Sequence, residues 1–258
     1  MLPIDLTGYK ALVCGSTQGI GKAIAEQLAK AGATIFLMAR NDNRLQEVID
    51  MLHGSGHKKL VVDFSDADSL IKHESFLIDA GIDILINNTG GPAPGPAHGA
   101  HWEDFEKAIQ MHLRMSHKLV QYTLPHMQTN QYGRIINVIS TSVKIPLDGL
   151  GVSNTVRGAM ASWAKTLANE LGPWNITVNN LLPGFMETQR LKQIIINKSL
   201  KSGLTESQVI EQMKKEVPAR RFGQPLEMGN FAAFLASPMA GYINGVSIPV
   251  DGGRTGSI

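Results

Sequence analysis

The sequence predicts an α/β protein built on a doubly wound parallel sheet of about seven strands. Short apolar runs alternate along the chain with longer stretches of helical periodicity. Most of the short runs are continuously apolar, which is typical of strands covered by helices on both faces. The 258 residues are enough for one large domain with a core of its own.

The expected elements follow from these two patterns. We expect strands at Lys10–Cys14, Thr34–Met38, Lys59–Phe64, Ile82–Asn87, Arg134–Ser140, Ile176–Leu182 and Gly245–Val250. We expect helices at Gly21–Gly32, Trp102–Met127 and Gly158–Gly172. Repeated strand–helix–strand order implies right-handed crossovers, and therefore a parallel sheet. The Gly- and Pro-rich segment Gly90–Ala100 follows a strand end, so we interpret it as a loop of the ligand crevice and treat 1–258 as a single domain.

The composition of the chain narrows the kinds of molecule that the protein can be expected to bind. The formal net charge of +2 is too small to indicate nucleic-acid binding, and no apolar run is long enough to span a membrane. Cys14 is the single cysteine, so we expect no internal disulfide and a reducing, cytoplasmic setting. The N-terminal stretch does not resemble a signal peptide. None of the eight histidines has metal-site spacing with a second ligand, and we predict no metal.

A glycine-rich turn joins the first expected strand to the first helix. It reads Gly15-Ser16-Thr17-Gln18-Gly19-Ile20-Gly21, in the spacing G-x-x-x-G-x-G. A pyrophosphate needs backbone N–H donors, close approach and the positive end of a helix dipole. Glycines leave no side chain between backbone and phosphate. The strand–turn–helix context favours a dinucleotide site over a tight turn that merely caps a helix, so we expect all seven residues to contact a dinucleotide.

Four further segments, taken with this turn, resemble the short-chain dehydrogenase/reductase family over nearly the full length. They are Asp63, Asn87-Asn88-Thr89-Gly90, Pro183-Gly184 and the final Gly241–Gly253, which ends in Asp-Gly-Gly. The resemblance implies a Rossmann-like fold and the general layout of the 3-oxoacyl-[acyl-carrier-protein] reductases. It places Asp63 against the adenine of the cofactor. It also implies cofactor contacts by Asn88, Gly90, Pro183, Gly184, Met186 and Thr188.

The end of the second strand favours NADP(H) over NAD(H). An acidic residue here would accept hydrogen bonds from a free ribose 2′-hydroxyl and repel a 2′-phosphate, but the chain has Ala39. Arg40 follows, and a guanidinium suits a phosphate. The alternative is that Arg40 is a solvated surface residue. Gln18 brings no second positive charge to the turn.

The catalytic group that the resemblance implies is only partly present. The family pairs hydride transfer with a serine, a tyrosine, a lysine four residues beyond it and an asparagine on the long preceding helix. Ser140 matches the serine, but Ser153 stands at the tyrosine position and Arg157 at the lysine position. His112 stands at the asparagine position. The four tyrosines lie elsewhere, and no alignment of the intervening loop recovers a phenol.

These departures leave the proton donor open. A serine hydroxyl is a much weaker acid than a phenol, and an arginine is permanently charged. Arg157 is still expected to hold the nicotinamide ribose. The candidate donors are His112, which titrates near neutral pH, Lys144 or Asp148 in the following loop, and a water held by Ser153. The competing interpretations are a packed or solvated helix residue for His112 and a solvated loop charge for Lys144.

Residues 187–223 form a longer connection than the fold requires, and the resemblance implies a lid over substrate and cofactor. The alternative is a helix packed on its own domain. We therefore predict an NADP(H)-dependent oxidoreductase that acts on a small-molecule carbonyl/alcohol pair, assembled as a homotetramer or homodimer through the two long helices. The rival hypothesis is a catalytically silent dinucleotide-binding protein, acting as a sensor or assembly partner.

Overall fold

The seven strands form one parallel sheet in the order β3-β2-β1-β4-β5-β6-β7 in the computed structural model, which describes residues 4–257. The strands are β1 Lys10–Cys14, β2 Thr34–Ala39, β3 Lys58–Val61, β4 Ile84–Asn87, β5 Gly133–Val138, β6 Ile176–Pro183 and β7 Ser247–Val250. The strand order reverses between β1 and β4, which creates a crevice outside their carboxyl ends. The predicted fold class is confirmed.

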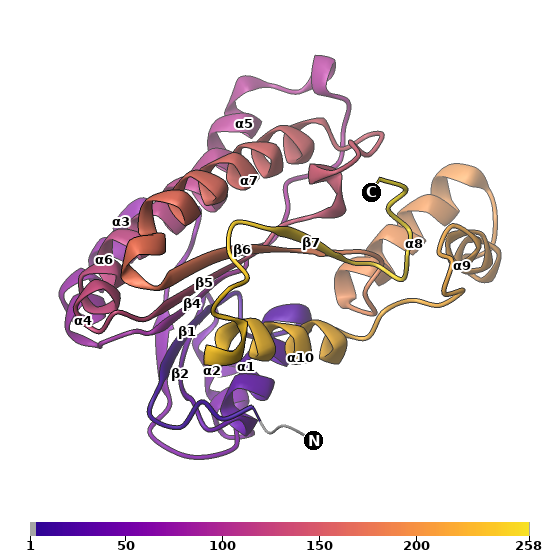
Figure 1. The fold of residues 1–258 in the computed structure, drawn as a ribbon. Coiled ribbons are helices and arrows are strands. Elements are labelled where there is room, and N and C mark those ends of the chain that lie inside the picture. The colour runs from indigo at the N-terminus through magenta and orange to yellow at the C-terminus, as the bar shows by residue number, and fades with distance from the viewer. Residues whose placement is uncertain (1–3, 258) are drawn as a thin grey trace.

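Helices cover both faces of the sheet (Figure 1). One layer contains α1 Gly19–Lys30, α2 Asp42–Ile49 and α10 Pro225–Ala236. The other contains α3 Ala67–Ile71, α4 Glu74–Asp79, α5 Trp102–Ile109, α6 Met115–Thr129 and α7 Gly151–Leu171. Two further helices, α8 Gln189–Ser202 and α9 Glu206–Lys215, lie beside one end of the sheet (Figure 1).

Alternate residues of each central strand enter different cores, which explains the continuously apolar runs. In β4, Ile84 and Ile86 pack in the core that α1 and α10 cover. Leu85 points to the opposite face and packs in the core that contains Leu119 of α6. All three side chains are fully buried, so a polar residue at any of these three positions would need a hydrogen-bond partner inside the protein.

The helices that carry the candidate site depart from the prediction in two ways. The long helix predicted over 102–127 is divided by a π-helical turn, η2 Gln110–Arg114, and π-turns are frequent at functional sites. Helix α7 begins at Gly151 rather than Gly158. The first turns of α7 are stable as helix because Val152 and Val156 pack against Ala108 of α5. Ser153 and Arg157 are therefore helical residues.

Other elements were not predicted. Helix α2 begins where the Asn41 side chain accepts a hydrogen bond from the backbone N–H of Arg44. Helices α8, α9 and α10 lie in the last third of the chain, and β3 ends at Val61, before the predicted end at Phe64. Within residues 4–257, no helix is both long and apolar enough to cross a lipid bilayer.

Candidate active site

The predicted site residues lie at the carboxyl ends of the strands, in two groups. One group surrounds the ends of β1, β2 and β3, which are consecutive in the sheet. The other surrounds the end of β5 and the start of α7. We call them the cofactor half, from Gly15–Gly21 to Asp63, and the catalytic half, which contains Ser140, Ser153, Arg157 and His112.

The glycine turn depends on the absence of side chains. Gly15 and Gly19 have φ values of +59° and +56°, a backbone region that favours glycine. A Cβ added at Gly21 would lie 2.3 Å from the carbonyl oxygen of Gly15, far inside contact distance. The turn therefore folds back closely on the start of α1, and only glycine fits at these positions.

Asn88 braces this turn from the end of β4. Its side-chain Nδ2 donates hydrogen bonds to the carbonyl oxygens of Cys14 and Gly15, both at 3.2 Å. Cys14 is buried, and burial raises the pKa of its thiol to about 12, so the thiol stays protonated and inert at neutral pH. The amide of Asn88 thus holds the turn in shape, which extends the cofactor contact expected from the sequence.

The turn fits a dinucleotide. No side chain caps the start of α1, since Gln18 makes no capping hydrogen bond, so the first N–H groups of the helix are open to an anion. The hydroxyl of Ser16 is fully buried and has no hydrogen-bond partner among residues 4–257. A phosphate with acceptor oxygens suits both features, and the glycine cradle leaves room for its approach.

Two arginines, not one, stand at the ribose end of the turn. Arg40 is largely exposed, with its Nη1 4.0 Å from the Asp63 carboxylate. Arg44 in the first turn of α2 places its Nη1 3.5 Å from the side-chain oxygen of Gln18. The sequence analysis missed Arg44 because it did not predict α2. The sequence signal for Arg44 is Asn41, because asparagine is a preferred N-cap residue and so indicates where the helix begins. The start of the helix then fixes the direction of the Arg44 side chain.

Asp63 lies just beyond β3, at the predicted adenine position. Burial works to raise the pKa of its carboxyl, but hydrogen bonds from Ser65 and the charges of Arg40 and Lys107 together lower it. The Ser65 backbone N–H and hydroxyl both donate to its Oδ1, at 2.9 and 2.7 Å. The ionised side chain is thereby fixed at the rim of the cofactor half.

Residues after β6 form the opposite wall. Gly184 passes against Asp251 at the end of β7, where an added Cβ would lie 2.6 Å from the Asp251 Cβ. Thr188 caps α8 by accepting a hydrogen bond from the Leu191 N–H, and its methyl group lies 3.2 Å from the Cβ position of Gly19. Pro183 and the buried Met186 lead into this wall. The start of α8 thus faces the glycine turn across the crevice.

Segment 187–223 has its own small core, made by Leu191, Ile195, Val209, Met213 and Phe222. Met186 and Gly223 pair at its base. Arg190 reaches the far side of the crevice, where its Nη2 donates to the carbonyl oxygen of Pro92 at 3.5 Å. That contact joins α8 to the predicted crevice loop.

In the catalytic half, Ser140 lies directly after β5. It caps a short 3₁₀ turn, and its Oγ accepts a hydrogen bond from the Ser142 N–H at 3.1 Å. Ser153 lies in the first turn of α7 and is half-buried. Paired hydrogen bonds from Gly95 to Gly149 and from Gly151 to Gly95 join the crevice loop to the residues before α7.

Arg157 is buried on α7 with few partners. Its Nη1 donates to the carbonyl oxygen of Val138 at 3.0 Å, while its Nε has no hydrogen-bond partner in the part of the chain that the structure describes. Its Nη2 lies 3.8 Å from the Cβ position of Gly91, on the crevice loop. Burial lowers the pKa of the guanidinium to about 10, so the group remains charged at neutral pH.

His112 is buried in the π-helical turn, and Thr89 at the end of β4 shares a hydrogen bond with its Nδ1. Burial, and then the charge of Arg157, lower the pKa of His112 to about 3. The imidazole is therefore neutral at physiological pH. Arg157 lies close enough to His112 for the guanidinium charge to disfavour protonation of the imidazole.

The tyrosines among the described residues lie outside the catalytic half. Tyr132 donates its hydroxyl to the carbonyl oxygen of Ala236, and burial raises its pKa. Tyr122 packs in the core beneath α6, Tyr9 stacks on Tyr132, and Tyr242 is fully exposed. Lys144 and Asp148 are exposed in the loop after Ser140.

A row of amides crosses the sheet beneath the site, and the sequence analysis missed it. Asn87 donates to Asn137 at 2.8 Å, Asn137 to Asn180 at 2.9 Å, and Asn180 to Ser247 at 3.0 Å. These residues are paired in register on β4 to β7. The available signal was an asparagine near the end of each apolar strand, where a buried amide requires a partner.

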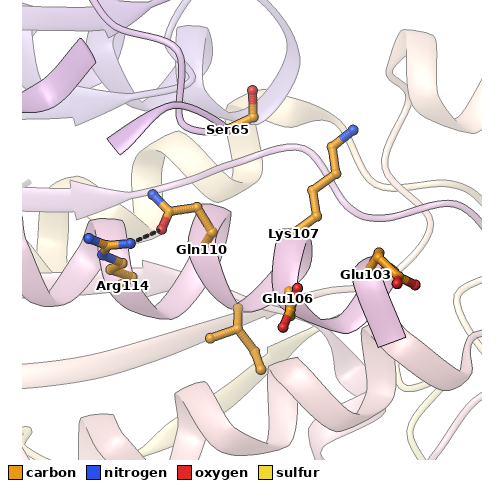
Figure 2. A pocket seen from close by; sticks show the side chains of 7 residues that line it. Ser65, Glu103, Glu106, Lys107, Gln110 and Arg114 are labelled. Carbon is orange, nitrogen blue, oxygen red and sulfur yellow. Dashed lines mark hydrogen bonds between the residues drawn. The ribbon is translucent and has the colours of Figure 1, made fainter. Parts of the chain in front are cut away.

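One hollow of the surface lies apart from the predicted crevice. A cavity of about 660 Å³ lies between Ser65 and the outer side of α5 and η2. Figure 2 shows Glu103, Lys107, Gln110 and Arg114 along the helix, with Ser65 across from them. None of the predicted catalytic residues lines it. Within residues 4–257, no group of three or more His, Cys, Asp or Glu side chains has the arrangement of a metal site.

Known proteins resemble this chain over its whole length. Residues 15–255 match the model of a family described as Enoyl-(Acyl carrier protein) reductase. The 3-oxoacyl-[acyl-carrier-protein] reductase FabG of Aquifex aeolicus (strain VF5) is 31% identical, over 98% of this chain and 99% of its own. The NADPH-dependent reductase BacG of Bacillus subtilis (strain 168) is 33% identical, over 96% and 98%. L-sorbose reductase from Gluconobacter frateurii, solved with NADPH and L-sorbose, is 29% identical, superposes with a TM-score of 0.93 and covers all of both chains.

Proposed function

The chain belongs to the short-chain dehydrogenase/reductase family and is an NAD(P)-dependent oxidoreductase, and from that premise we propose that it uses NADP(H) on a small-molecule carbonyl/alcohol pair. The observation that carries the proposal is the glycine turn braced by Asn88, which has the shape and the open N–H groups of a pyrophosphate site. The turn would hold the pyrophosphate of NADP(H), whose chemistry when bound would be hydride transfer at the end of the crevice where the catalytic half lies.

Three features support NADP(H) over NAD(H). Ala39 leaves the end of β2 without a carboxylate, and Arg40 and Arg44 both stand beside the turn. A ribose 2′-phosphate between them would receive two charge-assisted hydrogen bonds. BacG is named an NADPH-dependent reductase, and the sorbose reductase was solved with NADPH.

The proposed roles in the catalytic half follow from charge and position. Ser140 orients the substrate oxygen through its hydroxyl. Arg157 holds the nicotinamide ribose with its Nη groups and stabilises negative charge on the substrate. Neutral His112, fixed by Thr89, orients a water in the space next to Ser153 rather than donating a proton from an imidazolium.

The direct test measures NADPH binding and turnover on the same sample. NADPH should bind with a stoichiometry of one per chain, and its absorbance should fall when a panel of ketones and aldehydes is added. Tight binding without oxidation of NADPH by any member of the panel would instead support the silent dinucleotide-binding protein. Absence of NADPH binding contradicts both.

The lid and the assembly belong to the same proposal. We infer that 187–223 closes the crevice through the contact of Arg190 with Pro92, since that segment has its own core and faces the glycine turn. We also infer a homodimer or homotetramer through α5, α6 and α7, where Trp102 and Ile109 leave apolar surface exposed. A monomer mass by light scattering at micromolar concentration would contradict the assembly.

A further inference from the structure

One hydrogen bond holds the imidazole of His112 in the catalytic half. His112 lies in η2, the π-helical turn, and its side chain is buried. Thr89 lies just beyond the end of β4 and shares a hydrogen bond between its Oγ1 and Nδ1 of His112. Neither side chain makes a second hydrogen bond among residues 4–257. A strand end and a turn further along the chain therefore fix this ring together, and its Nε2 is left for another partner.

The proton count of this pair decides which nitrogen of His112 carries hydrogen. The imidazole is neutral, because burial lowers its pKa to about 3, so it has one N–H, and the threonine hydroxyl has one O–H. If Nδ1 carried the hydrogen, it would donate to Thr89 Oγ1, and the hydroxyl proton would need another acceptor, which the described residues do not offer. If Nε2 carries it, the hydroxyl donates to the bare Nδ1 and both groups are satisfied. The pair therefore favours the Nε2–H form.

The choice of nitrogen matters for a water between His112 and Ser153. Turn η2 packs against α7, which carries Ser153 in its first turn. A water that accepts the Nε2–H of His112 keeps both of its own O–H groups for donation, and one of them can point at a substrate oxygen. A bare Nε2 would instead accept one of these O–H groups and turn it away from the substrate. The Nε2–H form thus orients the water as a donor.

We propose that Thr89 is a positioning residue: its hydroxyl holds His112 in the Nε2–H form, so that a water beside Ser153 delivers the proton that completes carbonyl reduction. This inference rests on the proposed NADP(H)-dependent reduction and names the group that sets the direction of its proton delivery. Thr89 acts through the ring that it holds. The charge of Arg157, which is felt at His112, assists because it stabilises the hydroxide that the water leaves behind.

The reduction balances with water as the proton source. The carbonyl carbon gains a C–H bond from the hydride of NADPH, which is oxidised by two electrons, and the carbonyl π pair moves to oxygen. One O–H bond of the water breaks, and its proton joins the alkoxide to give the alcohol. The hydroxide left behind accepts the Nε2–H hydrogen bond of His112 and is then neutralised by the buffer. A bare Nε2 would present a lone pair to this hydroxide and oppose the step.

Nitrogen NMR of the full-length protein reads the tautomer directly. In protein labelled with ¹⁵N in its histidine rings, the bare and the protonated ring nitrogens have widely separated chemical shifts, and His112→Asn identifies the signals of His112. Wild type should show a bare Nδ1 and a protonated Nε2. Thr89→Ser keeps the hydroxyl and should keep this form. Thr89→Val keeps the shape of the side chain but removes the hydroxyl, so a protonated Nδ1 should appear.

The rate of alcohol formation from 4-phenylbutan-2-one with NADPH tests the consequence. Thr89→Val should lower kcat about tenfold or more, since a positioned proton donor is worth at least that much, while the KM for NADPH changes little. Thr89→Ser should restore most of the rate. Thr7→Val is the matched control, because Thr7 is exposed before the amino end of β1, at the opposite end of the sheet. It should leave both the tautomer and kcat unchanged.

The outcomes separate this inference from the function on which it rests. A protonated Nδ1 on His112 of wild type overturns the inference, and so does a Thr89→Val protein that keeps the wild-type tautomer or the wild-type kcat; NADP(H)-dependent reduction stands in either case. Where Thr89→Val does not fold, Thr89→Ala carries the same test. A wild type that binds NADPH and reduces no carbonyl compound removes the proposed function, and the role of Thr89 in proton delivery falls with it.

Discussion

The cofactor half and the catalytic half of the crevice differ in what holds them together. Backbone conformation dominates the cofactor half: positive φ angles at Gly15 and Gly19, a contact between Gly21 and Gly15, and the amide of Asn88 across the turn. Individual side chains dominate the catalytic half, where we propose that Ser153 and Arg157 stand in place of the tyrosine and the lysine that the family resemblance implies. Both halves of the crevice belong to the same fold.

The comparison teaches that a fold can retain a binding site while its chemistry changes. A side chain added at Gly21 would collide with backbone, whereas a change at Ser153 alters one half-buried side chain in the first turn of α7. Hydride supply depends on the backbone conformation of the cofactor half, and proton supply depends on individual side chains of the catalytic half. Proton delivery is therefore the part of the reaction that is most easily rebuilt.

The largest effect should come from the glycine turn. Gly21→Ala places a methyl group 2.3 Å from the Gly15 carbonyl oxygen, so the turn must open. We expect NADPH affinity measured by calorimetry to fall at least about a hundredfold. Gly256→Ala is the control, because nothing lies within 4 Å of its Cβ position. A folded Gly21→Ala protein that binds NADPH like the control would contradict the importance of turn geometry.

The next effect concerns stability in acid and tests the catalytic half. Burial lowers the pKa of His112 from 6.5 to about 3 in the folded protein. Between these values the unfolded chain binds the proton and the folded protein does not, so stability falls as pH falls below 6.5. From pH 6.5 to 5 this residue should cost about 2 kcal/mol of unfolding free energy.

Urea unfolding of wild type and His112→Asn across that pH range measures the effect. The variant should lose less stability than wild type on acidification, because the unfolded chain has one fewer histidine to protonate. Equal pH dependence in both proteins would show that His112 is accessible and protonated in the folded state, which would restore it as a candidate acid.

A smaller effect should appear at the ribose end of the cofactor half. Arg40→Ala removes one cation beside the expected 2′-phosphate, and the ratio of NADH to NADPH dissociation constants should fall about tenfold. Arg44→Ala should reduce the ratio by a smaller factor, since this side chain is also engaged with Gln18. Unchanged ratios in both variants would mean that these arginines are solvated surface residues.

The sequence predicted the sheet and the strand–turn–helix geometry of the glycine turn well, for a physical reason. Continuously apolar strands and the glycine turn are local patterns, and each has few structural solutions. Asn88 was expected as a cofactor contact, yet its hydrogen bonds to Cys14 and Gly15 join residues far apart in sequence, so only the structure shows the brace. Arg44 was missed with the short helix α2, whose apolar stripe has few residues.

The sequence analysis named the residues of the catalytic half, but it did not predict their burial or their protonation. His112 was weighed as a group that titrates near neutral pH, which holds for an exposed imidazole. The π-helical turn buries it beside Arg157, and the pKa falls to about 3. The orphaned Nε of Arg157 and the amide row from Asn87 to Ser247 likewise depend on tertiary packing. A local sequence pattern does not predict the burial of these side chains or their hydrogen-bond partners.

The double variant Ser153→Tyr with Arg157→Lys tests the contrast between the two halves most directly, measured as alcohol formed from 4-phenylbutan-2-one with NADPH affinity determined on the same samples. Restoring a phenol and a lysine should raise the rate of alcohol formation about tenfold or more, since general acid catalysis is worth at least that much. NADPH affinity should change little, because the glycine turn is untouched and a lysine keeps the positive charge that Arg157 places at the nicotinamide ribose. A folded double variant that binds NADPH like wild type and forms alcohol no faster would contradict the account, since the catalytic half would then already hold a working acid.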